Sequence, residues 1–328
     1  MSSNGSNMKR TRREFVRTLF VATQVAVASR FLPGGLFAAE VGQNVSAGGL
    51  NFIIFGDWGR NGEQDQSEVA AQMALAAKAT GARFIVSVGD NFYEDGVASV
   101  SDPQWQTSFE NVYHDPALQI PWQVILGNHD YHGNCEAQLE YARGHPRWNL
   151  PARYFVQTHR IDGTTVADFF YLDTTPMIQS YWQSHKTSAH VATQDVKKQI
   201  AWFKAALASS QARWKIVIGH HPIYSGGEHG DTTELVETIL PLLHKHKVQA
   251  WFNGHDHDLQ HLVAGDLNLF CSGAGSQVRA TEDTIYTKFA QARSGFTAVS
   301  LQPDRMSVRM TDNHGQLLYT TTVPVKQA

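Results

Sequence analysis

Short apolar runs, each followed by a glycine and then a polar side chain, recur along the chain from position 50 onward. The run at 84–88 is rich in β-branched residues, which is typical of a strand buried on both faces, and it stops at Gly89. Four other runs end at a glycine in the same way: 51–55, 121–126, 214–218 and 248–253. A further strand is predicted at 167–172, and short strands follow at 296–301, 306–310 and 317–323.

Helical periodicity lies between several of these runs. The pattern predicts helices over 67–80, 105–113, 195–207 and 234–246, the last despite Pro241. Gly81 stands where a C-cap glycine belongs, and Thr193 is a candidate N-cap. Segment 174–193 lacks periodicity and is expected to be a long loop of the kind that forms lids. Alternating strands and helices with a β-rich tail predict an α/β fold, a sheet sandwich flanked by helices.

The composition is that of an ordinary globular protein, with 42% hydrophobic and 17% charged residues. A net charge of -3 gives no basic surface for nucleic acid. Two cysteines are too few for a disulfide-rich scaffold or a cysteine-based zinc site. Cys135 and Cys271 could form one bridge or remain two buried thiols. The sixteen histidines are an unusual number, and several lie beside Asp, Gly or Asn.

The first 39 residues have the features of an export signal. Arg12 and Arg13 form a twin-arginine pattern, and the apolar run at 19–28 is too short to span a bilayer. We therefore expect a signal at 1–39, a linker at 40–49 and one domain at 50–328. The mature protein is expected in the periplasm or outside the cell, with no stable membrane anchor.

The polar residues that follow the strand ends are the candidates for metal binding and catalysis. The five pairs are Gly56-Asp57, Gly89-Asp90, Gly127-Asn128, Gly219-His220 and Gly254-His255. Glycine permits a tight turn, and neighbouring strand ends converge on one edge of a sheet. Two carboxylates, one amide and three imidazoles, with His257 included, would suit a pair of divalent or trivalent metals that clamps phosphoryl oxygens. One Gly-Asp turn is an ordinary structural feature, but five such strand ends in order favour the metal interpretation.

These blocks resemble the motifs of the purple acid phosphatases, which are calcineurin-like metallophosphoesterases. The resemblance is strongest to their small tartrate-resistant (mammalian-type) branch and covers nearly the whole chain after the signal. Tyr93, in Gly89-Asp90-Asn91-Phe92-Tyr93, is the specific feature, because most metallophosphoesterases lack it. Further similar segments are Gly226-Gly227-Glu228-His229-Gly230 and Ser272-Gly273-Ala274-Gly275. The resemblance implies a four-layer α/β/β/α metallophosphoesterase sandwich with mixed sheets.

The same resemblance implies a ligand set for two metal ions. A ferric ion, Fe(III), would be held by Asp57, Tyr93 and His257. A divalent ion, iron, zinc or manganese, would be held by Asn128, His220 and His255, and Asp90 would bridge the two. Hard phenolate and carboxylate donors favour Fe(III), whereas a neutral amide and imidazoles suit a divalent ion. Phenolate-to-iron charge transfer would colour the protein.

Two histidines are implied to act on the substrate. The resemblance assigns His129 and His229 to binding the phosphate and assisting proton transfer. The alternatives are that His129 orients a metal ligand and that His229 is a surface residue. His221 replaces an aromatic residue common in the branch and is expected to be structural. Segment 174–193 lacks the cysteine that links the mammalian lid to redox and proteolytic control.

The expected function is that of a secreted acid phosphatase. It would hydrolyse phosphomonoesters with a metal-bound hydroxide at an Fe(III)-M(II) site, and His129 or His229 would protonate the leaving alkoxide. The nearest alternative is another metallophosphoesterase, a phosphodiesterase or nucleotidase, against which Tyr93 argues. A non-catalytic metal- or phosphate-binding protein of the cell envelope is the other alternative, against which the two histidines argue. The sequence makes no prediction of oligomeric state.

Overall fold

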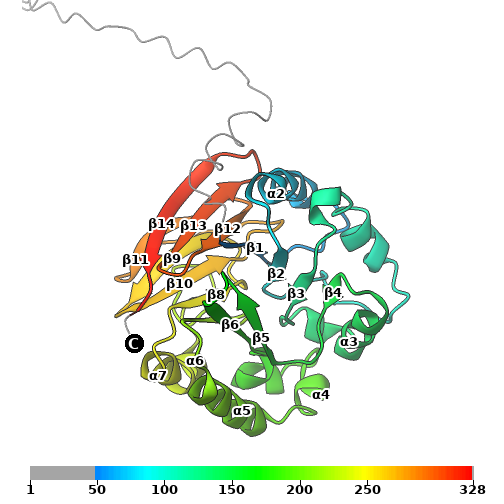
Figure 1. The fold of residues 1–328 in the computed structure, drawn as a ribbon. Helices are drawn as coiled ribbons and strands as arrows, with labels where there is room; N and C mark the ends of the chain where they lie inside the picture. The colour runs from blue at the N-terminus through cyan, green and yellow to red at the C-terminus, as the bar shows by residue number, and fades with distance from the viewer. Residues whose placement is uncertain (1–48, 327–328) are drawn as a thin grey trace, which may run out of the picture. The chain divides into compact units, whose positions relative to one another are not determined.

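The computed structural model describes residues 49–326, in which two seven-stranded sheets pack face to face with helices on their outer sides (Figure 1). The predicted signal segment and almost all of the predicted linker lie outside the described residues. Within the described residues, no helix is long and apolar enough to cross a membrane.

The first sheet has a parallel half and an antiparallel half. Its strand order is β14-β13-β12-β1-β2-β3-β4, in which β1 to β4 are parallel and β12 to β14 are antiparallel. Its strands are β1 (Leu50–Phe55), β2 (Phe84–Ser87), β3 (Trp122–Val124), β4 (Trp148–Asn149), β12 (Gly295–Leu301), β13 (Arg305–Asp312) and β14 (Leu317–Pro324). Helix α2 (Gln66–Thr80) joins β1 to β2 and ends at Gly81, which has a left-handed φ of 64°. The predicted βαβ unit and its C-cap are confirmed.

The second sheet is also mixed. Its order is β11-β9-β10-β8-β7-β6-β5, with β6, β7, β8 and β10 parallel. Its strands are β5 (Phe155–Arg160), β6 (Val166–Tyr171), β7 (Trp214–Ile218), β8 (Ala250–Asn253), β9 (Leu259–Ala264), β10 (Leu267–Ser272) and β11 (Thr287–Gln291). Helices α5 (Val196–Ser209), α6 (Thr233–Thr238) and α7 (Leu240–Lys245) cover its outer face (Figure 1).

Alternating side chains on β1 explain the layers. Phe52 and Ile54 point into an apolar cluster shared with the second sheet, whereas Ile53 and Phe55 point into a cluster shared with α2. A third cluster fills the space between the second sheet and its helices. Three apolar layers between four layers of secondary structure confirm the predicted α/β/β/α sandwich with mixed sheets.

Several predicted boundaries were wrong. The predicted helix 234–246 is divided between α6 and α7, because Pro241 lies in the first turn of α7, where its missing N–H costs nothing. The N-cap of α5 is Asp195 rather than Thr193, since an Asp195 carboxylate oxygen accepts the Lys198 N–H at 2.9 Å.

Shorter elements account for the remaining differences. The expected loop 174–193 contains the 3-10 turns η4 (Thr175–Met177) and η5 (Gln179–Trp182) and the short helix α4 (Ser188–Val191). The predicted helix 105–113 is a π-helix, η1 (Trp105–Glu110). Helix α3 (Cys135–Gly144), the turns η2 (Pro116–Leu118) and η3 (Asp130–His132), and strands β4, β5, β9, β10 and β11 were not predicted.

Both cysteines are free thiols. Cys135 and Cys271 are buried and unpaired, which decides between the two alternatives left open by the sequence. Each sulfur lies near a backbone carbonyl, that of Cys135 3.4 Å from Asp130 O and that of Cys271 3.2 Å from Asp256 O. They pack as small apolar residues and do not cross-link the chain.

Candidate functional site

The carboxyl ends of five parallel strands, three from one sheet and two from the other, supply one buried cluster of polar side chains. Asp57 follows β1, Asp90 and Tyr93 follow β2, and Asn128 follows β3. His220 follows β7 of the second sheet, and His255 and His257 follow β8. The structure brings together all seven side chains that the sequence proposed as metal ligands. They are at most 9% exposed.

The Tyr93 hydroxyl is the centre of one half of the cluster. It lies 3.1 Å from Asp57 Oδ1, 3.0 Å from Asp90 Oδ2 and 3.0 Å from His257 Nε2. A phenol has one proton to donate, so at most one of these three neighbours can receive it. The Nδ1 atom of His257 is buried and has no hydrogen-bond partner among residues 49–326. This half of the cluster therefore holds more lone pairs than protons.

His220 occupies the other half. Its Nδ1 lies 2.8 Å from Val88 O, to which it can only donate. Its Nε2 then faces two oxygens, Asn128 Oδ1 at 3.1 Å and Asp90 Oδ1 at 3.4 Å. A carbonyl contact at the far nitrogen is the usual way in which a metal-binding histidine is oriented. A second proton or a cation is needed where Nε2 meets these oxygens.

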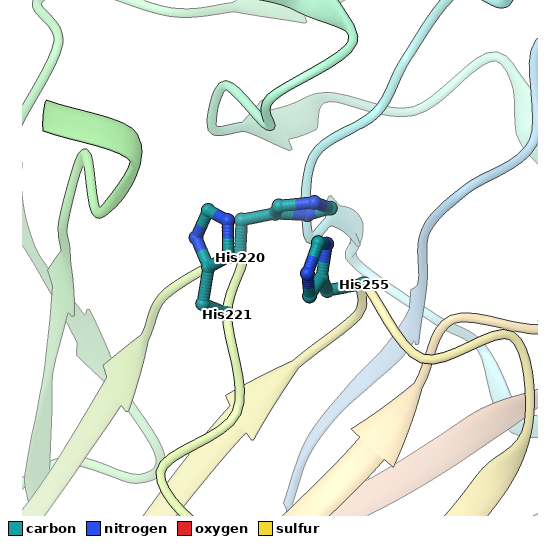
Figure 2. A group of neighbouring side chains, drawn as sticks. All are labelled: His220, His221 and His255. Carbon is teal, nitrogen blue, oxygen red and sulfur yellow. The ribbon is translucent and has the colours of Figure 1, made fainter. Parts of the chain in front are cut away.

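Three imidazoles group at the ends of β7 and β8 (Figure 2). The rings of His220 and His255 are 5.1 Å apart, and those of His221 and His255 are 4.4 Å apart. Both ring nitrogens of His221 have hydroxyl partners, Thr174 Oγ1 at 2.8 Å and Tyr181 Oη at 3.0 Å. These contacts support the structural role expected for His221 and leave His220 and His255 as the donors that face the cluster.

The backbone at the strand ends is shaped to bring these groups close. Asp57, Asp90 and His255 have left-handed φ values of 60°, 49° and 71°, which cost energy in residues with a Cβ and concentrate at functional sites. A Cβ at Gly127 would overlap the Asp90 carboxylate, and one at Gly254 would overlap that of Asp57. The glycines thus allow one strand end to approach the carboxylate of another.

Residues between the candidate ligands anchor these turns. The buried Trp58 indole donates to Ser87 Oγ at 2.8 Å and so joins the turn after β1 to β2. The Asn91 amide donates to Ile125 O at 2.9 Å, and the Gly127 N–H donates to Asp130 Oδ2 at 2.8 Å. Hydrogen bonds within and between the turns thus fix the geometry of the side chains that they present.

Charge in the cluster is balanced in a way that suits cations. Burial, together with the nearby Asp90 charge, raises the pKa of Asp57 well above its ordinary value. Burial alone would lower the pKa of His220, but the charges of Asp90 and Asp57 outweigh it and raise that pKa to about 9. Buried carboxylates need nearby positive charge, and a bound cation would supply it here.

The remaining imidazoles are ready to donate lone pairs. Burial, reinforced by the charge of Arg279, lowers the pKa of His257 to about 3. Burial and neighbouring histidines lower the pKa of His255 well below its usual range. A metal ligand must be deprotonated, and both rings meet that condition at mildly acidic pH. Anionic oxygens, neutral imidazoles and an excess of lone pairs together fit a pair of cations.

The two candidate proton-transfer residues border this cluster. The His129 N–H donates to Asp90 Oδ1 at 2.8 Å, its Nδ1 lies 2.6 Å from Glu94 O, and its ring packs 4.4 Å from that of Tyr93. The His229 ring stacks 4.0 Å from that of His255. Both candidates therefore contact a proposed ligand directly.

Two arginines beside the cluster were not predicted from the sequence. The Arg60 guanidinium lies 3.8 Å from the centre of the Tyr93 ring, and Arg279 Nη1 lies 2.8 Å from His229 Nε2. Arg60 directly follows the Gly56-Asp57-Trp58-Gly59 block, and Arg279 follows Ser272-Gly273-Ala274-Gly275 closely. Their closeness to conspicuous motifs was the only signal in the sequence.

Comparisons with known proteins agree with this geometry. Residues 50–259 match the model of the family described as calcineurin-like phosphoesterase. The chain is 36% identical to purple acid phosphatase 4 of Arabidopsis thaliana, over 83% of each chain. It is 35% identical to tartrate-resistant acid phosphatase type 5 of Sus scrofa, over 90% of this chain and 93% of that protein.

Solved structures share the fold. One is GAP50, the anchor in the inner membrane complex of Plasmodium, with a TM-score of 0.74 and 26% identity over 85% of this chain and 89% of that chain. Another is the purple acid phosphatase PPD1 from yellow lupin (Lupinus luteus) seeds, with a TM-score of 0.62. The lupin structure is 17% identical over 84% of this chain and 53% of that chain. At this identity the likeness supports the fold alone. From the family match and the curated relatives it follows that this chain belongs to the calcineurin-like phosphoesterases and, among them, to the purple acid phosphatases.

Proposed function

We propose that this protein is a metal-dependent acid phosphatase that hydrolyses phosphomonoesters. The observation that carries the proposal is the Tyr93 hydroxyl, within 3.1 Å of Asp57, Asp90 and His257 at the converging strand ends. A phenol in this place separates the purple acid phosphatases from most other metallophosphoesterases. The relatives named as purple or tartrate-resistant acid phosphatases support the same activity.

Membership of the purple acid phosphatases implies a centre of two metal ions, and we propose which residues hold it. Asp57, Tyr93 and His257 would hold Fe(III). The divalent ion, iron, zinc or manganese, would be held by the neutral donors Asn128, His220 and His255, with Asp90 between the two. When bound, the two ions would supply the nucleophile from water and neutralise the charge that develops on the phosphoryl oxygens.

The protein's own side chains would handle the leaving group. His129 donates its Nδ1 hydrogen to Glu94 O, so its Nε2 is the atom that can carry a transferable proton. Its side chain is 20% exposed, which leaves the ring accessible to a substrate. We assign His129 as the acid that protonates the leaving alkoxide and His229 as a residue that contacts the phosphate. His229 Nε2 faces a guanidinium and is less suited to deliver a proton.

A non-enzymatic role is the second candidate. The structural likeness to GAP50, whose described role is that of an anchor, favours it, since a phosphatase fold can serve in assembly. The cluster of candidate ligands argues for catalysis, because an anchor has no need of buried carboxylates in strained turns. Turnover of a phosphomonoester distinguishes the two.

A direct test combines an assay, metal analysis and a visible spectrum of the purified protein. We expect hydrolysis of p-nitrophenyl phosphate at mildly acidic pH, about two metal ions per chain and a charge-transfer band. Tyr93→Phe should abolish the band because it removes the phenolate. The control Tyr113→Phe changes a buried tyrosine outside the cluster and should keep the band. A colourless, iron-free enzyme that cleaves diesters would instead support the phosphodiesterase or nucleotidase alternative.

We also propose export to the periplasm or the medium through the twin-arginine pathway. The basis is the Arg12-Arg13 pair with the apolar run behind it. Replacing both arginines with lysine keeps the charge, yet it should leave the phosphatase activity in the cytoplasmic fraction. Unchanged activity in the periplasmic fraction of the double variant would contradict this route.

A further inference from the structure

Arg279 lies beside the proposed phosphatase centre. Its backbone N–H donates to His257 O at 2.9 Å, so its position is fixed by a residue that is itself a candidate ligand. Its side chain reaches His229, where Nη1 lies 2.8 Å from Nε2, and the His229 ring stacks on that of His255. The His229 ring thus contacts both this guanidinium and the ring of a proposed metal ligand.

The second guanidinium at the centre, that of Arg60, is held more firmly. Arg60 Nε donates to Ser276 Oγ at 3.1 Å, Nη1 donates to Glu94 at 2.7 Å, and the group lies over the Tyr93 ring. Its side chain is 12% exposed. These contacts use one face of the guanidinium and two of its nitrogens, so Arg60 contributes fixed positive charge at this place.

Arg279 is held less tightly. Its carboxylate neighbour is Glu228, 3.6 Å from Nε, and the Glu228 side chain is 62% exposed. Such a long, solvent-exposed ion pair contributes little free energy and is readily exchanged. The Arg279 side chain is 29% exposed, so solvent and solutes can reach it. A substrate oxyanion could therefore replace Glu228 without a large cost.

We propose that Arg279 binds a second anionic group, a carboxylate or phosphate, on the alcohol portion of the substrate. This inference rests on the proposed phosphatase function and names its substrate class: phosphomonoesters whose leaving alcohol carries another negative charge. A guanidinium pairs with carboxylate or phosphate through two parallel hydrogen bonds, which gives direction as well as charge. Arg60 adds to the positive potential that such a substrate meets.

The geometry also predicts which kinetic parameter the Arg279 contact changes. The second anion lies away from the phosphorus that reacts, so its contact with Arg279 is the same before and during the reaction. A contact of that kind lowers KM and leaves kcat largely as it was. The preference should therefore be visible as a difference in KM between matched substrates.

The test compares 3-phosphoglycerate with glycerol 3-phosphate, which differ in a carboxylate replaced by a hydroxymethyl group. The wild-type protein is expected to favour 3-phosphoglycerate in kcat/KM, and Arg279→Gln should reduce the ratio of the two values about tenfold. Any loss that acts through His229 affects both substrates equally and cancels in the ratio. Arg279→Lys, which keeps the charge but not the fork, should fall between the two.

The matched control is Arg83→Gln, which removes an exposed arginine just before β2, at the opposite end of that strand from Asp90. Its substrate ratio should equal that of the wild type. If Arg279→Gln left the ratio of the two kcat/KM values unchanged, the proposal would be overturned. It would also be overturned if the ratio fell equally in Arg279→Gln and Arg83→Gln.

A binding measurement keeps the two proposals apart. If the wild-type protein hydrolysed neither these substrates nor p-nitrophenyl phosphate, the proposed function would fail. Calorimetric binding of 3-phosphoglycerate and glycerol 3-phosphate to the wild type and to Arg279→Gln would still test the proposed anion subsite at Arg279. The expected result is that the substitution weakens binding of 3-phosphoglycerate by about tenfold relative to glycerol 3-phosphate. Equal weakening of both ligands would overturn the subsite.

Discussion

Replacing Asp90 with alanine is expected to remove both metal ions and to lower phosphomonoester turnover on the order of 10³-fold or more. One Asp90 oxygen faces the Tyr93 hydroxyl, and the other faces His220 Nε2 and accepts the His129 N–H. Its carboxylate contacts side chains of both halves of the cluster, Tyr93 in one and His220 in the other, so both donor sets lose a member without it. Metal content per chain and kcat for p-nitrophenyl phosphate measure the two effects.

Loss of metal must be separated from loss of the fold. Asp168→Ala is a suitable control, because Asp168 is a buried aspartate on β6 that accepts hydrogen bonds from Thr158 and Ser210, away from the strand ends. It should retain both metals. Circular dichroism of both variants reports whether they fold. A folded Asp90→Ala protein with two metals and ordinary turnover would refute the assignment of the site.

Replacing His129 with alanine is expected to keep both metals and to lower kcat on the order of 10²- to 10³-fold. The hydrogen bond that His129 makes with a candidate ligand runs from its backbone N–H to Asp90, and alanine preserves it. What the substitution removes is the ring, whose Nε2 is placed to deliver a proton. His129→Ala should therefore keep its metal content while its kcat falls, whereas Asp90→Ala should lose both metal and turnover.

His132 provides the matched control for this experiment. Its ring is 4.8 Å from that of His129, and its Nδ1 lies 3.2 Å from Glu94 O and 3.3 Å from Asp95 Oδ1. His132→Ala removes a neighbouring imidazole that makes no contact with the candidate ligands and should change kcat less than about threefold. If His132→Ala cost as much as His129→Ala, the specific role of His129 would be wrong. If His129→Ala lost metal, His129 would instead orient a ligand.

The gathering of the seven side chains could be predicted from the sequence because the signal is local. Asp57, Asp90 and Asn128 each follow a glycine at the end of an apolar run, and parallel strands place such ends at one edge. That reasoning does not require knowledge of strand order. It assumes one edge of one sheet, however, whereas the structure brings together strand ends of two packed sheets, with β1 and β2 in one and β7 in the other.

Features that depend on contacts between distant parts of the chain could not be predicted from these local patterns. The contact between Arg279 and His229 joins residues fifty positions apart, and nothing in either segment indicates the other. The state of Cys135 and Cys271 depends likewise on three-dimensional placement. Strands such as β4 and β9 become recognisable through their neighbours in the sheet more than through their own pattern. Asp195 rather than Thr193 caps α5, because the helix begins at Val196 and Asp195 directly precedes it.

Because the candidate donors follow strands of both sheets, a bound pair of cations would cross-link the two halves of the sandwich. Assembly of the sheets and capture of the ions would then be one event, completed where the polypeptide folds. With the proposed export of the folded chain, the ions carried outward would be those that the cytoplasm offers. The metal supply of the compartment of synthesis, and not that of the compartment of use, would determine the composition of the centre.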